Sequence, residues 1–251
     1  MRKAVETLLR IALFVCVFLV WMWVLRQPFS ETVNLSIIIG AVVLVFPIVW
    51  VGSLLLDRDP TPASAEWLTT LIHAIVMILF GAAVIRAVTT YEDWRGWLIP
   101  IPVEVGLLLA ILTGAAALLA VLNLAVRGWG APFAIALSRR LAIDWLYAWT
   151  RNPMVLASLA FLLALGIWLR SMFFVLWVCF LVIPALLFFV KVFEERELEI
   201  RFGIGYSEYK ARTPMLIPRR PMPAKELPKQ KKHAVKKGSR SKRPLRRPSR
   251  K

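Results

Sequence analysis

The sequence predicts an all-α fold: a polytopic transmembrane helical bundle of about six spans, ending in a C-terminal helical hairpin and a cytoplasmic amphipathic helix. Apolar residues make up 59% of the 251 positions, and the mean hydropathy is +0.68. Both values exceed those of ordinary soluble domains. Several apolar windows reach the length of about 20 residues that a helix needs to cross the hydrocarbon core. These windows lack the polar–apolar alternation of barrel strands, so helices are the predicted spans.

Six windows are predicted as spans: Leu8–Leu25, Val33–Leu56, Trp67–Val88, Val103–Val126, Met154–Leu169 and Met172–Val190. The fifth is short, which predicts a partial or tilted crossing. The first follows Met1-Arg2-Lys3 and could be read as a signal peptide, but it is longer than a typical apolar region of about 7–15 residues. No small-residue cleavage site follows it. We therefore expect a retained helix.

The Lys and Arg residues of the short loops predict the orientation. With six crossings, one side carries more of them: Arg2, Lys3, Arg58, Arg127, Arg139, Arg140, Arg151 and the basic tail. The other side carries Arg26, Arg86, Arg95 and Arg170. This asymmetry predicts a multi-pass protein of the inner or plasma membrane with both termini in the cytoplasm.

Cysteine and histidine usage excludes two classes of site. Cys16 and Cys179 both lie inside apolar runs, which argues against a disulfide framework and a thiolate metal site. His73 and His233 have no carboxylate or thiol at ligand spacing, so no metal site is predicted. His73 is interpreted as a bundle-interior or interfacial residue, although an ionisable group inside a membrane is also a functional candidate.

The chain divides into three zones. Residues 1–127 form the N-terminal transmembrane helices, where Gly106, Ala110 and Gly114 recur at four-residue steps that let another helix approach closely. Residues 128–218 contain the last hairpin and a charged helix in which Glu197 and Arg201 form a modest stabilising pair. Residues 219–251 form the tail.

The tail carries 15 Lys and Arg residues against one acid, Glu226. With Pro, Ser and Gly interspersed and few large apolar residues, it is predicted to be disordered. The anionic headgroups of the cytoplasmic leaflet are the favoured partner, because each nearby basic residue contributes roughly 1 kcal/mol there. Nucleic acid is the less favoured polyanion, since no aromatic residues are interleaved with the charges.

The last hairpin is bracketed by polar motifs. Arg151-Asn152-Pro153-Met154 precedes it, and Glu194-Glu195 follows it. Further along come Phe202-Gly203, Tyr206, Tyr209, Pro214 and Leu216-Ile217-Pro218. A hairpin that crosses the bilayer and returns places both motifs at one membrane face. The sequence therefore predicts one polar site at the rim of an apolar pocket.

This arrangement resembles the isoprenylcysteine carboxyl methyltransferase and phospholipid methyltransferase families of integral membrane enzymes. The resemblance covers about residues 144–218 and rests on an Arg-His/Asn-Pro-Met-Tyr-x-Gly pattern and on the spacing of the downstream residues. Two positions depart from the pattern, since Val155 replaces the tyrosine and Ala157 the glycine. Upstream, Tyr147 and Trp149 keep the two aromatic positions, but Trp145-Leu146 stands where many members have Gly-Pro.

The resemblance implies methyl transfer from S-adenosylmethionine to a membrane-embedded lipid, isoprenoid or hydrophobic small molecule. Arg151 would pair with the cofactor carboxylate, and Glu194 or Glu195 with its ammonium or ribose groups. Asn152 would hydrogen-bond to an adenine edge or a ribose hydroxyl, and Pro153 would fix the backbone where the helix begins. Further residues are implied at the cofactor site: Tyr147, Tyr206 and Tyr209. No catalytic base is assigned, because an ionised carboxylate acceptor needs none and an amine acceptor would.

Each motif also has a simpler interpretation. The glutamates suit the solvated end of a helix, Arg151 a positive-inside anchor, and Asn-Pro a helix start. The alternative function is accordingly a non-catalytic membrane scaffold or accessory protein that keeps the methyltransferase-like fold. The methyl acceptor, the oligomeric state and the role of the first four spans are not determined by the sequence.

Overall fold

The computed structural model describes residues 2–90, 98–128 and 141–221, and within them only a single isolated β-bridge accompanies the helices. The all-α prediction is therefore confirmed. The basic tail from residue 222 and residues 129–140, between the fourth span and the hairpin, lie outside the described residues. Five long uninterrupted helices are α1 (Arg2–Arg26), α2 (Glu31–Arg58), α3 (Pro62–Thr89), α4 (Val103–Gly128) and α6 (Pro153–Trp168).

The last long helix is continuous but has two π-helical turns. It consists of α7 (Met172–Trp177), η3 (Val178–Val182), α8 (Ile183–Phe188), η4 (Phe189–Glu194) and α9 (Glu195–Phe202). Pro184 lies in α8 between the two π-helical turns. Such turns relieve the missing hydrogen bond of a proline and recur at functional sites. Two short helices complete the fold, α5 (Leu146–Trp149) and α10 (Ile204–Arg212).

The predicted spans agree with the helices. Five segments are long and apolar enough to cross a membrane among the described residues: Leu8–Arg26, Glu31–Arg58, Pro62–Thr89, Val103–Val126 and Met172–Phe202. The remaining apolar helix, α6, has 16 residues and is shorter than a full crossing, as expected for the fifth span. The protein is a multi-pass helical membrane protein.

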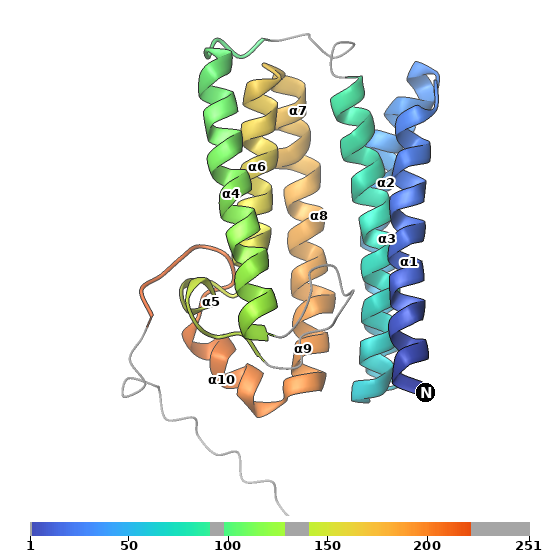
Figure 1. Cartoon of the computed structure of the whole chain (residues 1–251), viewed down its shortest axis with the longest axis vertical. Helices are drawn as coiled ribbons and strands as arrows, with labels where there is room; N and C mark the ends of the chain where they lie inside the picture. Colours follow the sequence, from blue (N-terminus) through green and yellow to red (C-terminus); the bar gives the residue numbers. More distant parts are fainter. Residues whose placement is uncertain (1, 91–97, 129–140, 222–251) are drawn as a thin grey trace, which may run out of the picture. The chain divides into compact units, whose positions relative to one another are not determined.

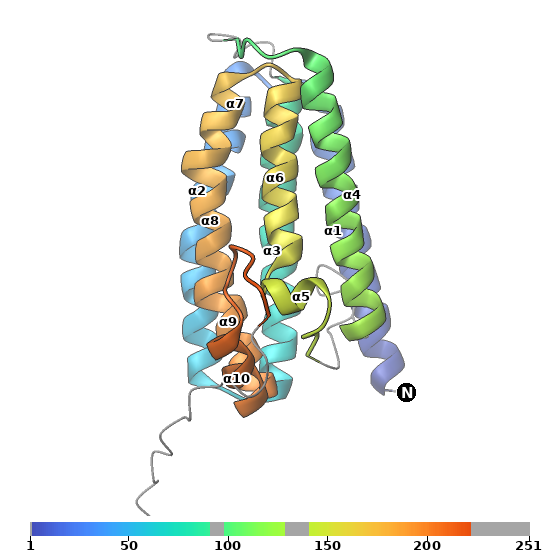
Figure 2. The same cartoon turned by 90° about the vertical axis from the view of Figure 1, so that its left-hand side faces the viewer.

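The helices of this part of the chain form two layers. Figures 1 and 2 show α1, α3 and α2 side by side in one layer, with α4, α6 and the α7–α9 helix in the other. The layers contact each other mainly where α2 packs against η3, α8 and η4. Val42, Val45 and Val49 of α2 are fully buried there against apolar side chains such as Phe193 of η4. The N-terminus lies at the same end as α5, α9 and α10 (Figure 1).

Arg86 is the charged residue on which the first three helices converge. The sequence predicted it at the less basic end of the bundle, yet its side chain is buried within α3. Its Nε donates to Asn34 Oδ1 at 2.7 Å and its Nη1 to the Val24 carbonyl at 3.2 Å. The guanidinium also lies 5.3 Å from the centre of the Phe29 ring. These contacts satisfy a charge that would be costly inside a bilayer.

Gly106 explains the closest helix approach in the second layer. A Cβ at this position would meet the backbone of Trp168, at the end of α6, whereas a Cβ at Gly114 would make ordinary contact with the Phe161 ring at 3.5 Å. The predicted small-residue steps on the fourth span therefore face α6, and Gly106 is the position where the backbones touch.

We expect Gly106→Ala to destabilise the protein by about 1–3 kcal/mol, because the added methyl group meets backbone rather than a mobile side chain. Gly40→Ala is the matched control, since no atom lies within 4 Å of a Cβ there. That control should be neutral or stabilising by up to about 1 kcal/mol through its higher helix propensity. Thermal unfolding midpoints in nanodiscs measure both. Equal shifts in the two variants would contradict the assigned contact.

Candidate functional site

The segment before α6 turns sharply at Trp145. Its backbone has φ 55° and ψ −119°, in the region that favours glycine. Many members of the resembling families have Gly where this chain has Trp145, and Gly adopts such a conformation without strain. The turn leads into α5 and directs the Tyr147 side chain into the protein interior, where it is 8% exposed.

The stretch after α10 fastens the Arg-Asn-Pro segment by hydrogen bonds. The Arg151 amide donates to the Pro214 carbonyl at 2.9 Å. The Thr150 hydroxyl and the Asn152 side-chain amide both donate to the Met215 carbonyl, at 3.1 and 2.9 Å. The Asn152 amide group, predicted as a cofactor contact, therefore holds the protein's own backbone. Pro153 is buried as the first residue of α6.

A small polar cavity of about 120 Å³ lies between α4, the segment before α6, α9 and α10. Most of the residues predicted for the cofactor site line it: Tyr147, Arg151, Asn152, Glu194, Tyr206 and Tyr209. The hairpin thus brings together residues that are up to 62 positions apart, as in the hydrogen bond from the Tyr209 hydroxyl to the Tyr147 carbonyl at 2.6 Å. The remaining polar residue of the prediction, Glu195, contacts this site through Arg151.

Arg151 has unused hydrogen-bonding capacity in this cavity. Its side chain is 7% exposed, and its Nη2 lies 2.7 Å from Glu195 Oε1. The Nε and Nη1 atoms are buried and have no hydrogen-bond partner among the residues that the structure describes. A buried guanidinium N–H group without a partner is costly. The geometry therefore suits a ligand that presents an anionic acceptor such as a carboxylate.

Glu195 is surrounded by cations. Besides Arg151, its Oε2 accepts from Lys191 Nζ at 3.1 Å and from Lys210 Nζ at 2.8 Å, while its side chain is 2% exposed. Lys210 also contacts Glu199 at 2.8 Å. Burial lowers the pKa of Lys210, but its hydrogen bonds to Glu195 and Glu199 outweigh burial and raise the pKa above its usual value. Glu195 thus orients Arg151 within a network of ion pairs.

Glu194 differs from Glu195 in its contacts. It is half-buried, lines the polar cavity, and forms no ion pair or hydrogen bond with any residue in the described ranges. Because successive helical residues point about 100° apart, one glutamate reaches the cations while the other remains available. The π-helical turn η4 ends at Glu194 and so sets this register.

The tyrosines of the cavity remain protonated at physiological pH. Burial, followed by the nearby Glu194 carboxylate, raises the pKa of Tyr147 above its usual value. Burial, followed by the nearby Glu195 carboxylate, also raises the pKa of Tyr206. Burial likewise raises the pKa of Tyr209, with a further contribution from Tyr147. The phenol groups are therefore neutral hydrogen-bonding groups.

A second and larger cavity adjoins the polar one. It has a volume of about 610 Å³, lies between α1, α3 and the second layer, and is mostly apolar. The two cavities share a wall of five residues: Leu124, Met154, Val155, Glu194 and Leu198. Val155, the departure from the family's tyrosine, therefore stands between them, whereas Ala157 lines neither cavity.

The larger cavity has a polar lining near α9. Glu197 and Arg201, predicted as a modest pair, form a contact of 2.6 Å with side chains 3% and 8% exposed. Both line this cavity together with His73, whose Nδ1 lies 2.9 Å from the Thr69 carbonyl. Since a carbonyl only accepts, Nδ1 is the donor in this hydrogen bond. His73 therefore lies inside the bundle, where it lines this cavity.

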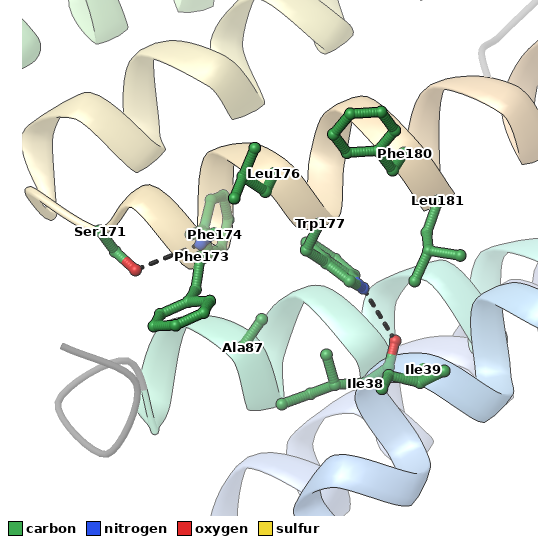
Figure 3. A pocket seen from close by; sticks show the side chains of 10 residues that line it. All are labelled: Ile38, Ile39, Ala87, Ser171, Phe173, Phe174, Leu176, Trp177, Phe180 and Leu181. Carbon is green, nitrogen blue, oxygen red and sulfur yellow. Dashed lines mark hydrogen bonds between the residues drawn. The ribbon is translucent and has the colours of Figure 1, made fainter. Parts of the chain in front are cut away.

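An apolar groove at the opposite end of the bundle lacks comparable chemistry. It has a volume of about 300 Å³ and lies between α2, the end of α3 and the α7–η3 segment (Figure 3). Trp177 Nε1 donates to the Ile38 carbonyl at 3.0 Å and Ser171 caps α7, so these polar groups are satisfied internally. The two cavities that meet at α9 are therefore the candidate site.

Several residues of the site were not singled out from the sequence. The sequence predicts only a charged helix around Lys191 and Lys210. It gives no signal for Ser158 and Leu198 as site residues. The i, i+4 spacing of Lys191 and Glu195 was a usable signal for one ion pair. Nothing in the sequence indicated that α10 returns Lys210 to Glu195, because this depends on the break at Gly203, with φ +54°.

These features define a class: a multi-pass helical membrane protein in which a small cavity lined by Arg151, Glu194 and tyrosines adjoins a larger apolar one. The family model for phospholipid methyltransferase matches residues 101–204, from the start of α4 to the start of α10. Over these residues the chain carries the pattern of that family, which confirms the resemblance inferred from the hairpin motifs. No curated protein and no solved structure matches the chain.

Proposed function

We propose that the protein transfers a methyl group from S-adenosylmethionine to a membrane-embedded lipid, isoprenoid or other hydrophobic acceptor. The observation that carries the proposal is the wall that the two cavities share. One cavity is polar and contains two Arg151 N–H donors that have no partner among the described residues, and the other is apolar. One compartment suits a charged cofactor and the other a hydrophobic acceptor. The family match over residues 101–204 supports the same reaction class.

The residues of the polar cavity fit the amino-acid end of this cofactor. The Nε and Nη1 groups of Arg151 supply donors for a carboxylate. Glu194 supplies an acceptor for an ammonium or hydroxyl group. A volume of about 120 Å³ holds such a polar end but not a whole nucleoside, so the remainder of the cofactor requires adjoining space.

When bound, S-adenosylmethionine supplies an electrophilic methyl group on a sulfonium. The protein contributes position and exclusion of water. Glu195 fixes Arg151, and the strap formed by residues 213–219 fixes the backbone on which Arg151 stands. Leu124, Met154 and Leu198 give the shared wall an apolar surface, which strengthens electrostatic interactions within it. Holding the two reactants in the correct orientation removes a large part of the activation free energy of such a transfer.

The loop charges support a cytoplasmic position for this site, with both termini on the same side. α1 begins at the same end of the bundle as α5, α9 and α10 (Figure 1), and residues of those three helices line the polar cavity. The 15 basic residues from Arg219 onward would hold this end against anionic headgroups.

Equilibrium binding of S-adenosylmethionine to the full-length protein in nanodiscs tests the proposal. We expect saturable binding that weakens at least tenfold in Arg151→Met, because charge-assisted hydrogen bonds of about 1.5–3 kcal/mol are removed. This variant should fold, since Glu195 keeps Lys191 and Lys210. Arg196→Met is the matched control, because Arg196 pairs with Asp57 at the exposed surface at 2.7 Å. Absence of binding by the folded wild-type protein would favour the scaffold alternative.

A further inference from the structure

Exposed apolar side chains occur outside the spans, around α5 and in the strap (residues 213–219). α5 lies between the fourth and fifth predicted spans and the strap follows α10, so neither belongs to a membrane-crossing helix. Trp145, just before α5, is nevertheless 70% exposed, Trp149 at its end 45%, and Ile217 of the strap 79%. Tryptophan is favoured at the level of the lipid headgroups, where hydrocarbon and water meet. These side chains therefore suit contact with a membrane surface.

Hydrogen bonds hold the strap beside α5. The Arg219 amide donates to the Trp149 carbonyl at 2.9 Å, and the Thr150 hydroxyl donates to the Met215 carbonyl at 3.1 Å. Thr150 and Met215 are 65 positions apart in the sequence. Figures 1 and 2 show the strap alongside α5, at the end of the bundle that carries α9 and α10. The exposed apolar side chains of the two segments are thus brought together only while the strap is docked.

Cations extend this surface. Arg219 and Arg220 are exposed and closely follow Ile217. One acidic residue, Asp144, is exposed beside Trp145, and the two arginines outweigh its charge. The loop charges predict that this end of the bundle faces the cytoplasm, where the leaflet carries anionic lipids. The docking patch is defined as Trp145, Trp149, Ile217, Arg219 and Arg220.

The strap couples the docking patch to the polar cavity. The Arg151 amide donates to the Pro214 carbonyl at 2.9 Å, so the docked strap fixes the backbone that carries the Arg151 side chain. Tyr147 of α5 lines the same cavity. A surface that binds the whole patch binds the docked strap better than a released one, because release separates the two halves of the patch. Such a difference in affinity shifts the equilibrium toward the docked state.

We propose that the docking patch binds the anionic surface of the cytoplasmic leaflet, and that this contact keeps the strap docked on the backbone of Arg151. The first part concerns only the protein and the lipid. The second part rests on the proposed function, since an Arg151 that is already in place binds the cofactor carboxylate more tightly. Linkage makes the coupling reciprocal, so the cofactor in turn strengthens the contact between patch and membrane.

Hydrogen–deuterium exchange of the full-length protein tests the docking without any cofactor. Nanodiscs of phosphatidylcholine alone are compared with nanodiscs of equal parts phosphatidylcholine and phosphatidylglycerol. A basic residue near an anionic surface shifts an equilibrium by roughly fivefold, so two arginines set a limit of roughly 25-fold. We expect the amides of the strap and of residues 149–152 to exchange at least threefold more slowly in the anionic nanodiscs. Equal exchange in the two lipids would overturn the inference.

A matched pair of double variants separates the patch from the tail. Arg219→Gln/Arg220→Gln leaves the backbone hydrogen bond of Arg219 in place but should abolish the protection by anionic lipid. Lys231→Gln/Lys232→Gln removes the same charge from the tail, outside the patch, and should retain the protection. If both variants lose it equally, the total charge of the chain is responsible and the patch is not.

A second pair tests the apolar part of the patch. Ile217→Ser should reduce the protection by anionic lipid at least twofold, because less apolar surface enters the headgroup region. Ile204→Ser is the matched control, since this side chain at the start of α10 is 75% exposed and lies outside the patch. Full protection in Ile217→Ser would show that charge alone holds the strap and would overturn the composite patch.

Binding of S-adenosylmethionine to the same preparations separates this inference from the proposed function. The wild-type protein should bind at least threefold more tightly in the anionic nanodiscs, and Arg219→Gln/Arg220→Gln should bind equally in both lipids. Cofactor binding that does not depend on the lipid would overturn the coupling and leave the proposed function intact. Protection by anionic lipid without any cofactor binding would support the docking patch and overturn the proposed function.

Discussion

Glu195→Ala is expected to destabilise the protein by about 3–5 kcal/mol. The reason is that removal of one partner from a buried ion pair leaves the other charge uncompensated. Arg151, whose side chain is 7% exposed, would lose its only ion-pair partner among the described residues, while Lys210 would keep Glu199. The midpoint of thermal unfolding in nanodiscs, with the same lipid throughout, measures the change.

Two controls separate this explanation from a general effect of charge removal. Glu199→Ala removes a glutamate whose side chain is 32% exposed and should cost less than about 1 kcal/mol. In Glu195→Ala/Arg151→Met the stranded guanidinium is absent, so much of the lost stability should return. A double variant no more stable than Glu195→Ala would show that Arg151 is not the uncompensated charge.

The sequence predicted the spans well because hydrophobic length is sufficient to identify them. It also predicted that Arg151, Glu194 and the tyrosines meet, since a hairpin returns the chain to the same membrane face. The close approach at Gly106 followed from its small-residue spacing. These predictions needed only local composition and the number of crossings.

The division of roles within the site did not follow from the sequence. Glu194 and Glu195 are chemically identical neighbours, and only the helix register after η4 determines which one reaches Arg151 and Lys210. The role of Asn152 could not be predicted from the sequence either, because its side chain donates to the backbone carbonyl of Met215. The apolar cavity likewise depends on how α3 packs opposite α6 and α8, and His73 alone did not indicate this packing.

The second large expected effect is that of Glu194→Gln, which should weaken cofactor binding without lowering the stability of the fold. In Glu194→Gln we expect S-adenosylmethionine to bind roughly 10- to 100-fold more weakly, since a charged acceptor worth about 1.5–3 kcal/mol is replaced by a neutral one. Unfolding stability should stay the same or rise, because a half-buried carboxylate without an ion-pair partner in the described structure is removed. Such a trade of stability against function is typical of residues retained for binding.

Glu195→Gln provides the matched comparison, because the two substitutions are identical and adjacent. It should lower stability through the Arg151 and lysine contacts and weaken cofactor binding only indirectly, as Arg151 loses its orientation. Isothermal titration and thermal unfolding on both variants distinguish the roles. If Glu194→Gln binds the cofactor as tightly as the wild type, the available carboxylate does not hold it, and the arginine alone must account for recognition. If both variants lose stability equally, the register that separates the two glutamates is wrong.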